Sequence, residues 1–191
     1  MAITFFYSPR SSATRALWAL EELGVAFEKV RLDLAKDDQK KPEFLAINPN
    51  GKVPAMIDGD ARLFESLAIL LHVGDRYGEP KGLWPTAGTA ERAEAFTWSV
   101  WGTVTLLAAA LHPDAPDAKK HWEACLEILD ARLEAEPYLI GSSFTLADVA
   151  VVSNVAFGVM AAALAIEPYK NVVAWLERCR GRPAFARAMN G

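Results

Sequence analysis

The chain has 191 residues, of which 52% are hydrophobic and 23% charged, enough for one large domain or two small ones with a buried core. The formal net charge of −4 argues against nucleic-acid binding, which usually needs a surplus of basic residues. Cys125 and Cys179 have neither paired nor metal-ligand spacing, so they favour a reducing cytoplasm over a disulfide scaffold.

Strand and helix patterns alternate along the first 77 residues. Short runs of β-branched, aromatic or alternating apolar residues predict strands at 3–7, 27–33, 53–57 and 61–64. Apolar residues at spacings of three and four predict helices at 13–23, which Gly24 ends, and at 65–77. Asp58-Gly59-Asp60 predicts a tight hairpin turn between the last two strands. The expected order is βαβ followed by ββα.

The composition changes after residue 77. Glycine and proline are frequent from Gly78 to Gly88, which indicates a linker at 78–87. Helical spacing then recurs around 91–111, 122–133, 145–165 and 171–189. We therefore expect an α/β domain at 1–77 and an all-helical domain at 88–191.

One apolar stretch, residues 149–166, approaches the length of a membrane span. Ser153, Asn154 and Gly158 interrupt it, which favours a helix buried in the protein core. We therefore expect no membrane association.

The turn between the first strand and the first helix carries hydroxyl groups. Pro9 fixes the turn, and Ser11 and Ser12 follow where a helix begins with unpaired N–H groups and a positive dipole. Either serine is explained by helix capping, and an anion site at the helix start is the alternative.

A second segment, residues 48–54, contains the turn dipeptides Asn-Pro and Asn-Gly. Pro54 lies just inside a predicted strand, where it cannot donate a ladder hydrogen bond. A cis bond at Val53-Pro54 would turn the Val53 backbone outward to pair with an extended peptide. An ordinary turn with an edge proline is the alternative.

The third segment, Glu65-Ser66, begins the second helix. The Ser66 hydroxyl and the helix N–H groups are suited to a carboxylate, and Glu65 to an amine, so the pair would recognise an α-amino-acid end. By itself, Glu65 is a favourable acid in a first helical turn.

Together these segments resemble the N-terminal, thioredoxin-like domain of the glutathione transferases, particularly the serine-type phi class and related bacterial enzymes. Residues 11–15 are similar to the serine segment of that class, residues 48–54 to its cis-proline loop, and Glu65-Ser66 to its γ-glutamyl clamp.

A fourth match lies in the helical half. Residues 142–148 resemble the family's capping box, in which Thr145 caps a helix and Asp148 reaches back. The resemblance thus spans nearly the whole chain. The turn at residues 8–12, called the serine turn below, contains no cysteine, whereas redox-type members of the family have one there. We therefore expect Cys125 and Cys179 to pack within helices.

The resemblance implies a role for each segment. Ser11 would donate a hydrogen bond to the glutathione sulfur, with Ser12 and then Tyr7 as alternatives. The other contacts to glutathione would come from the Val53 backbone beside Pro54, from Glu65 and Ser66 at the γ-glutamyl end, and from Lys40 and Lys52 at the glycine carboxylate. The phi pattern usually has a histidine in place of Gln39 and a glutamine in place of Lys52.

An electrophilic substrate is expected beside this site, in an apolar pocket. Tyr7 and Arg10 from the turn, with Trp98, Trp101 and Val104 from the first helix after the linker, are its candidate residues. The alternative places both tryptophans in the core or in a dimer interface. The three histidines have no ligand spacing, so we expect no metal.

The function expected from the resemblance is activation of the glutathione thiol, as thiolate, for attack on a hydrophobic electrophile. Peroxide reduction, isomerisation or dehalogenation at the same site is an alternative. A non-catalytic binding or regulatory protein, as found among starvation proteins and translation-factor subunits of the family, is another. The family also implies a homodimer, and the two unpaired cysteines favour the cytoplasm.

Overall fold

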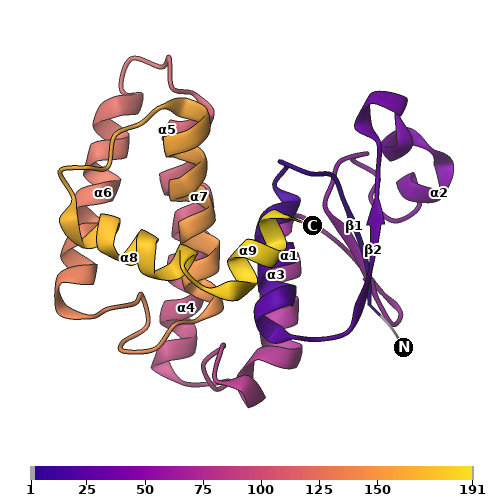
Figure 1. The fold of residues 1–191 in the computed structure, drawn as a ribbon, viewed down its shortest axis with the longest axis horizontal. Coiled ribbons are helices and arrows are strands. Elements are labelled where there is room, and N and C mark those ends of the chain that lie inside the picture. The colour runs from indigo at the N-terminus through magenta and orange to yellow at the C-terminus, as the bar shows by residue number, and fades with distance from the viewer. Residues whose placement is uncertain (1–2, 191) are drawn as a thin grey trace. The chain divides into compact units, whose positions relative to one another are not determined.

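The computed structural model describes residues 3–190, which divide into two compact units (Figure 1). Among these residues, the first unit comprises 3–77 and 183–190, and the second comprises Gly78–Arg182. The expected helical domain at 88–191 includes the segment from Pro183 onward, whereas in the structure this segment packs within the first unit.

The first unit is built on a four-stranded sheet in the order β2-β1-β3-β4. The strands are β1 (Ile3–Tyr7), β2 (Phe27–Arg31), β3 (Ala55–Asp58) and β4 (Ala61–Phe64). β1 is parallel to β2, and β3 is antiparallel to both β1 and β4. The predicted strands are confirmed, although β3 begins only after Pro54, which has no N–H for the ladder.

Helices cover both faces of this sheet. Figure 1 shows three of them on one face, α1 (Ala13–Leu23), α3 (Ser66–Val73) and α9 (Pro183–Met189), and the short α2 (Pro42–Leu45) on the other. Phe6 and Phe44 meet on the α2 face, with ring centroids 5.7 Å apart. The predicted helix at 65–77 is α3 continued by a π turn, Gly74–Gly78. No helix was predicted between the strand at 27–33 and the loop at 48–54, where α2 lies.

The last predicted helix, 171–189, is two helices in the structure. α8 (Lys170–Arg180) ends at Gly181, and Pro183 begins α9 in the first turn, where its missing N–H costs nothing. α9 packs against α1 through Trp18 and Phe185, whose ring centroids are 5.0 Å apart. Arg187 adds a 2.8 Å ion pair to Glu21. These contacts attach the end of the chain to the sheet-bearing unit.

The second unit is helical, as predicted. Its helices are α4 (Ala90–Trp101), α5 (Leu107–Leu111), α6 (Ala118–Ala135), α7 (Leu146–Ala162) and α8, and a π turn, Gly102–Leu106, joins α4 to α5. The predicted helix at 91–111 is therefore present with this irregular turn inside it. Both cysteines are buried, Cys125 on α6 and Cys179 on α8, as expected for packing residues.

α7 is the predicted buried helix, and the structure explains the three residues that interrupt its apolar run. Asn154 donates from Nδ2 to the carbonyl of Gly102 in the π turn, at 2.8 Å. Ser153 bonds to the carbonyl of Val149 within α7. Gly158 lies so close to the Trp122 ring that a Cβ would collide with it. Within residues 3–190, no helix combines the length and the apolarity needed to cross a membrane.

The predicted capping box at the start of α7 is confirmed, and Asp148 does more than cap. One carboxylate oxygen accepts from the Thr145 N–H at 2.8 Å, and the other accepts from the Leu139 N–H and from Trp175 Nε1 at 3.0 and 2.8 Å. The side chain is fully buried, and this burial raises the pKa of Asp148 while the hydrogen bonds oppose the rise. One carboxylate thereby joins α7, α8 and the preceding loop.

A second buried carboxylate, Asp58, lies at the end of β3. His72 Nε2 is 2.8 Å from Oδ2, and the Tyr77 hydroxyl donates at 2.9 Å. Arg76 adds an ion pair at 3.5 Å. Burial opposes ionisation of Asp58, but the hydrogen bonds from His72 and Tyr77 and the charge of Arg76 outweigh it, so the pKa of Asp58 lies below its usual value.

We expect Asp58→Asn to lower the free energy of unfolding by about 1–3 kcal/mol at neutral pH, because a buried acceptor is lost. Since the folded-state pKa is depressed, this stabilisation is fully present above the unfolded pKa of about 4 and disappears as the pH falls through the folded value. Urea unfolding of the wild type and of Asp58→Asn at several acidic pH values measures the difference in their free energies of unfolding. This difference should become smaller below about pH 4. Asp60→Asn, which changes an exposed residue of the turn, is the matched control. A stability difference between wild type and Asp58→Asn that does not change with pH would contradict the expectation.

Candidate functional site

The three segments singled out in the sequence meet at one end of the strands, beside one row of paired residues. Phe6 of β1 pairs with Ala55 of β3, which pairs with Phe64 of β4. The serine turn follows this row on β1, Val53-Pro54 precedes it on β3, and Glu65-Ser66 follows it on β4. Because β3 is antiparallel to its neighbours, all three segments leave the sheet on the same side.

The two candidate serines have different surroundings. Ser11 is half-buried, and its hydroxyl donates to the Ser8 carbonyl at 2.7 Å and accepts from the Ala13 N–H at 3.2 Å. Ser12, at the N-cap position, is exposed and caps no helix N–H; its hydroxyl lies 3.4 Å from the Val53 carbonyl. Ser11 therefore orders the turn, while Ser12 lies beside the proline loop.

The Val53-Pro54 peptide bond is cis, as predicted. Asn48 shapes the loop before it, because its amide accepts from the Asn50 N–H at 3.0 Å and donates to the Lys52 carbonyl at 2.6 Å. Within the described part of the chain, the Val53 main chain has only the weak contact from Ser12. Its N–H and carbonyl thus remain available to an extended ligand.

The two candidate lysines lie at the same loop. A Cβ placed on Gly51 would be 2.8 Å from Lys40 Nζ, so this ammonium group lies against the backbone next to Lys52. Both lysine side chains are exposed, and neither has an ion-pair partner among residues 3–190. The loop accordingly presents two positive charges.

Glu65 and Ser66 occupy the start of α3. Glu65 has φ 68° and ψ 118°, an unfavourable conformation for a residue with a side chain, and its exposed carboxylate caps no helix N–H. Such outliers are found mainly at functional sites. Ser66 is 8% exposed, and its hydroxyl accepts from Arg15 Nη1 at 3.3 Å.

Arg15 contacts the candidate site, and the sequence did not predict this contact. It is 7% exposed on α1, and burial lowers its pKa to about 10, so it remains charged at neutral pH. Its contact with Ser66 links the helix that begins at the serine turn to the start of α3. The position of this charged residue next to the apolar Ala16 and Leu17, on the buried side of α1, was the feature of the sequence that could have indicated such a contact.

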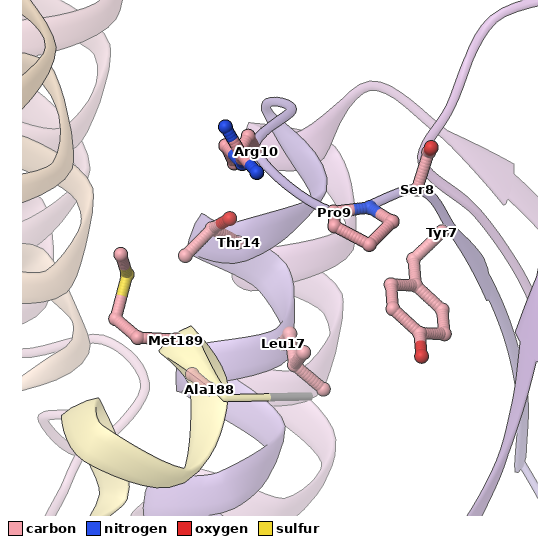
Figure 2. A pocket seen from close by; sticks show the side chains of 8 residues that line it. All are labelled: Tyr7, Ser8, Pro9, Arg10, Thr14, Leu17, Ala188 and Met189. Carbon is pink, nitrogen blue, oxygen red and sulfur yellow. The ribbon is translucent and has the colours of Figure 1, made fainter. Parts of the chain in front are cut away.

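A cavity of about 120 Å³ lies between the serine turn, α1 and α9 (Figure 2). It brings the predicted pocket residues Tyr7 and Arg10 together with others, and its full lining is Tyr7, Ser8, Pro9, Arg10, Thr14, Leu17, Ala188 and Met189. No spacing signal in the sequence connects the last two residues to the turn, because they are almost a whole chain length away from it.

Trp98 and Trp101 belong to α4 in the second unit. Both are half-buried, and their rings meet edge to face with centroids 5.2 Å apart. Val104 in the following π turn is 67% exposed. The expected part of these residues in an electrophile pocket stays a prediction.

Comparison with known proteins gives consistent results over the whole chain. Models of the glutathione S-transferase N-terminal and C-terminal domains match residues 1–75 and 90–183. Glutathione S-transferase F10 of Arabidopsis thaliana is 32% identical, over 97% of this chain and 95% of the relative. The disulfide-bond oxidoreductase YfcG of Escherichia coli is 31% identical, over 98% and 94%. A theta-class glutathione S-transferase from Xanthomonas axonopodis pv. citri, solved with glutathione bound, has a TM-score of 0.85 and 31% identity, over 100% and 98%.

Proposed function

Because the chain belongs to the glutathione S-transferase family, we propose that it binds glutathione in its first unit and joins it, through its sulfur, to a hydrophobic electrophile. One observation carries this proposal. Beside the paired residues Phe6, Ala55 and Phe64, at one end of the strands, lie a helix start with hydroxyl groups, a main-chain segment free to pair and an amino-acid clamp. A γ-glutamyl tripeptide thiol needs each of these.

The proposed part of Ser11 is to stabilise the thiolate. A free thiol with a pKa near 8.5 is only about 3% ionised at pH 7, and lowering the pKa by about two units makes roughly three quarters of it thiolate. The Ser11 hydroxyl now donates to the neutral Ser8 carbonyl. Donation to a thiolate is charge-assisted and stronger, so the ligand would redirect this hydrogen bond. Ser12 and Tyr7 are the alternative donors.

The transfer itself needs no covalent bond to the enzyme. The thiol proton is lost to solvent as the thiolate forms, the sulfur then bonds to the electrophilic carbon, and the leaving group departs with its electron pair. Ser11 would donate a hydrogen bond to the sulfur throughout. The start of α1 adds its positive dipole to this stabilisation.

The remaining polar groups suit the ends of the tripeptide. Glu65 would pair with the γ-glutamyl amine and Ser66 with its carboxylate, while the Val53 backbone, next to Pro54, would pair with the cysteinyl unit. Support for this arrangement comes from the unsatisfied Glu65 carboxylate and from the charged Arg15 that fixes Ser66. Lys40 and Lys52 would pair with the glycine carboxylate.

Calorimetric titration with glutathione tests the proposal. We expect binding at submillimolar to millimolar concentration, and Glu65→Gln should weaken it about tenfold or more, because a charge-assisted contact contributes about 1.5–3 kcal/mol. Glu43→Gln, which changes an exposed acid on α2, is the matched control. If millimolar glutathione produces no binding heat, the proposed function is wrong.

A second candidate is glutathione-dependent reduction of disulfides, favoured by the similarity to the oxidoreductase YfcG. The serine turn lacks a cysteine, and both cysteines of the chain are buried in the second unit, so any such reaction would use glutathione thiols alone. Parallel assays with a chloronitrobenzene and with hydroxyethyl disulfide distinguish the two reactions. Peroxide reduction, isomerisation and dehalogenation need the same glutathione site.

We also propose that the protein acts as a homodimer in the cytoplasm. The family resemblance supports the dimer, and the two free cysteines suit a reducing compartment. Sedimentation analysis of the purified chain measures the first of these properties directly.

A further inference from the structure

The cavity between the serine turn and α9 contains one charged side chain. Arg10 is the only ionised residue among those that line it, and its guanidinium group has no hydrogen bond or ion pair within residues 3–190. The acidic residues of α1 are already engaged, since Glu21 binds Arg187 and Glu22 accepts from Trp18 Nε1 at 2.9 Å. The cavity is therefore positive and has no internal counter-charge.

The other residues that line the cavity are apolar, apart from three that carry hydroxyl groups. Figure 2 shows Arg10 and Thr14 on the side of Met189, with the Tyr7 ring on the other side of Pro9. Met189 is 50% exposed, and its flexible side chain can adapt to a bound ring. The Tyr7 hydroxyl has no hydrogen bond among the described residues, so it is a further available donor.

We propose that this cavity selects electrophiles that carry a carboxylate on a single small ring, and that Arg10 binds the carboxylate. This inference rests on the proposed transferase function and names its substrate class. A guanidinium group holds a carboxylate through two parallel hydrogen bonds, which no apolar pocket offers. The volume of about 120 Å³ is well below that of pockets for larger ligands, roughly 300–1,000 Å³, which favours one ring. Arg10 directly precedes Ser11 in the same turn, so one ring could separate the carboxylate bound by Arg10 from the reacting sulfur.

A matched pair of probes reports on this selectivity. With 4-chloro-3-nitrobenzoate, the thiolate sulfur bonds to the ring carbon that bears chlorine, the carbon–chlorine bond breaks, and chloride leaves with the electron pair. The corresponding benzamide undergoes the same substitution but carries no charge. The two products are S-(4-carboxy-2-nitrophenyl)glutathione and its carbamoyl counterpart. Because they no longer react, their affinities can be measured without any reaction taking place.

Calorimetry with the two products, on the wild type and on Arg10→Gln, is the test. We expect the wild type to bind the carboxy product at least about fivefold more tightly than the carbamoyl product, and the ratio to fall to about one in Arg10→Gln. Arg10→Lys should keep part of the preference. Arg62→Gln, an exposed arginine on β4 outside the cavity, should leave the ratio unchanged.

The outcomes separate this inference from the proposed function. Equal binding of the two products by the wild type, or a ratio that Arg10→Gln does not alter, overturns the inference and leaves glutathione transfer standing. Binding of glutathione without either product overturns it as well, because the cavity would then not accept an aryl group. Absence of binding by glutathione and both products overturns the proposed function together with the inference.

Discussion

Replacing Ser11 with alanine is expected to lower the rate of glutathione transfer about tenfold or more and to raise the pKa of the bound thiol. The physical reason is the loss of one charge-assisted hydrogen bond to the thiolate, which contributes about 1.5–3 kcal/mol. The pKa follows from the thiolate ultraviolet absorbance of the glutathione complex as a function of pH. The pH dependence of kcat/KM should move in the same direction.

Two variants separate thiolate stabilisation by Ser11 from its structural part in the turn. Ser11→Ala also removes the hydrogen bonds to Ser8 and Ala13, so a change in glutathione affinity alone would indicate a displaced turn. Ser12→Ala removes only the weak contact to Val53 and should change the rate little. An unchanged thiol pKa in Ser11→Ala, with a raised pKa in Ser12→Ala, would transfer the role to Ser12.

Replacing Asp148 with asparagine is expected to cause the largest loss of stability, about 3 kcal/mol, or about 10 °C in Tm for a chain of this size. Both carboxylate oxygens of Asp148 accept hydrogen bonds, one from Thr145 and the other from Leu139 and Trp175. Asparagine has only one acceptor oxygen, so its NH₂ group must face N–H donors in either orientation. The site is fully buried, and water cannot compensate.

Urea unfolding followed by circular dichroism measures this loss. Asp117→Asn is the matched control, because Asp117 occupies the N-cap position of α6 without any side-chain capping bond. A loss below about 1 kcal/mol for Asp148→Asn would show that the hydrogen bonds around the carboxylate do not stabilise the fold as described.

Local patterns were enough to predict most elements. Periodicity and breakers such as Gly24 marked helices and strands, and the capping box marked the start of α7. The cis bond before Pro54 was expected from the resemblance, because the residues alone also allowed an ordinary turn. The resemblance joined the three segments of the candidate site, which were individually ambiguous, and the pairing of β1, β3 and β4 supplies the physical reason why they meet.

Other features depend on contacts between distant residues, which local patterns do not contain. The polar Asn154 interrupts the apolar run of α7, but only the fold shows that it bonds to the irregular turn at Gly102. Likewise, α9 has no local sign that it joins α1, because Phe185 and Trp18 are far apart in the sequence. The lining of the cavity by Met189 depends on the same contact.

The pairing of Phe6 with Ala55 and Phe64 has a consequence for insertions and deletions. An extra residue inside β3 would shift its register by one position and turn its side chains to the opposite face of the sheet, moving Pro54 away from the serine turn. Extra residues at Gly59, in the turn at the other end of β3, leave this row unchanged. The hairpin tip is therefore a place where length can vary without changing the geometry around Ser11.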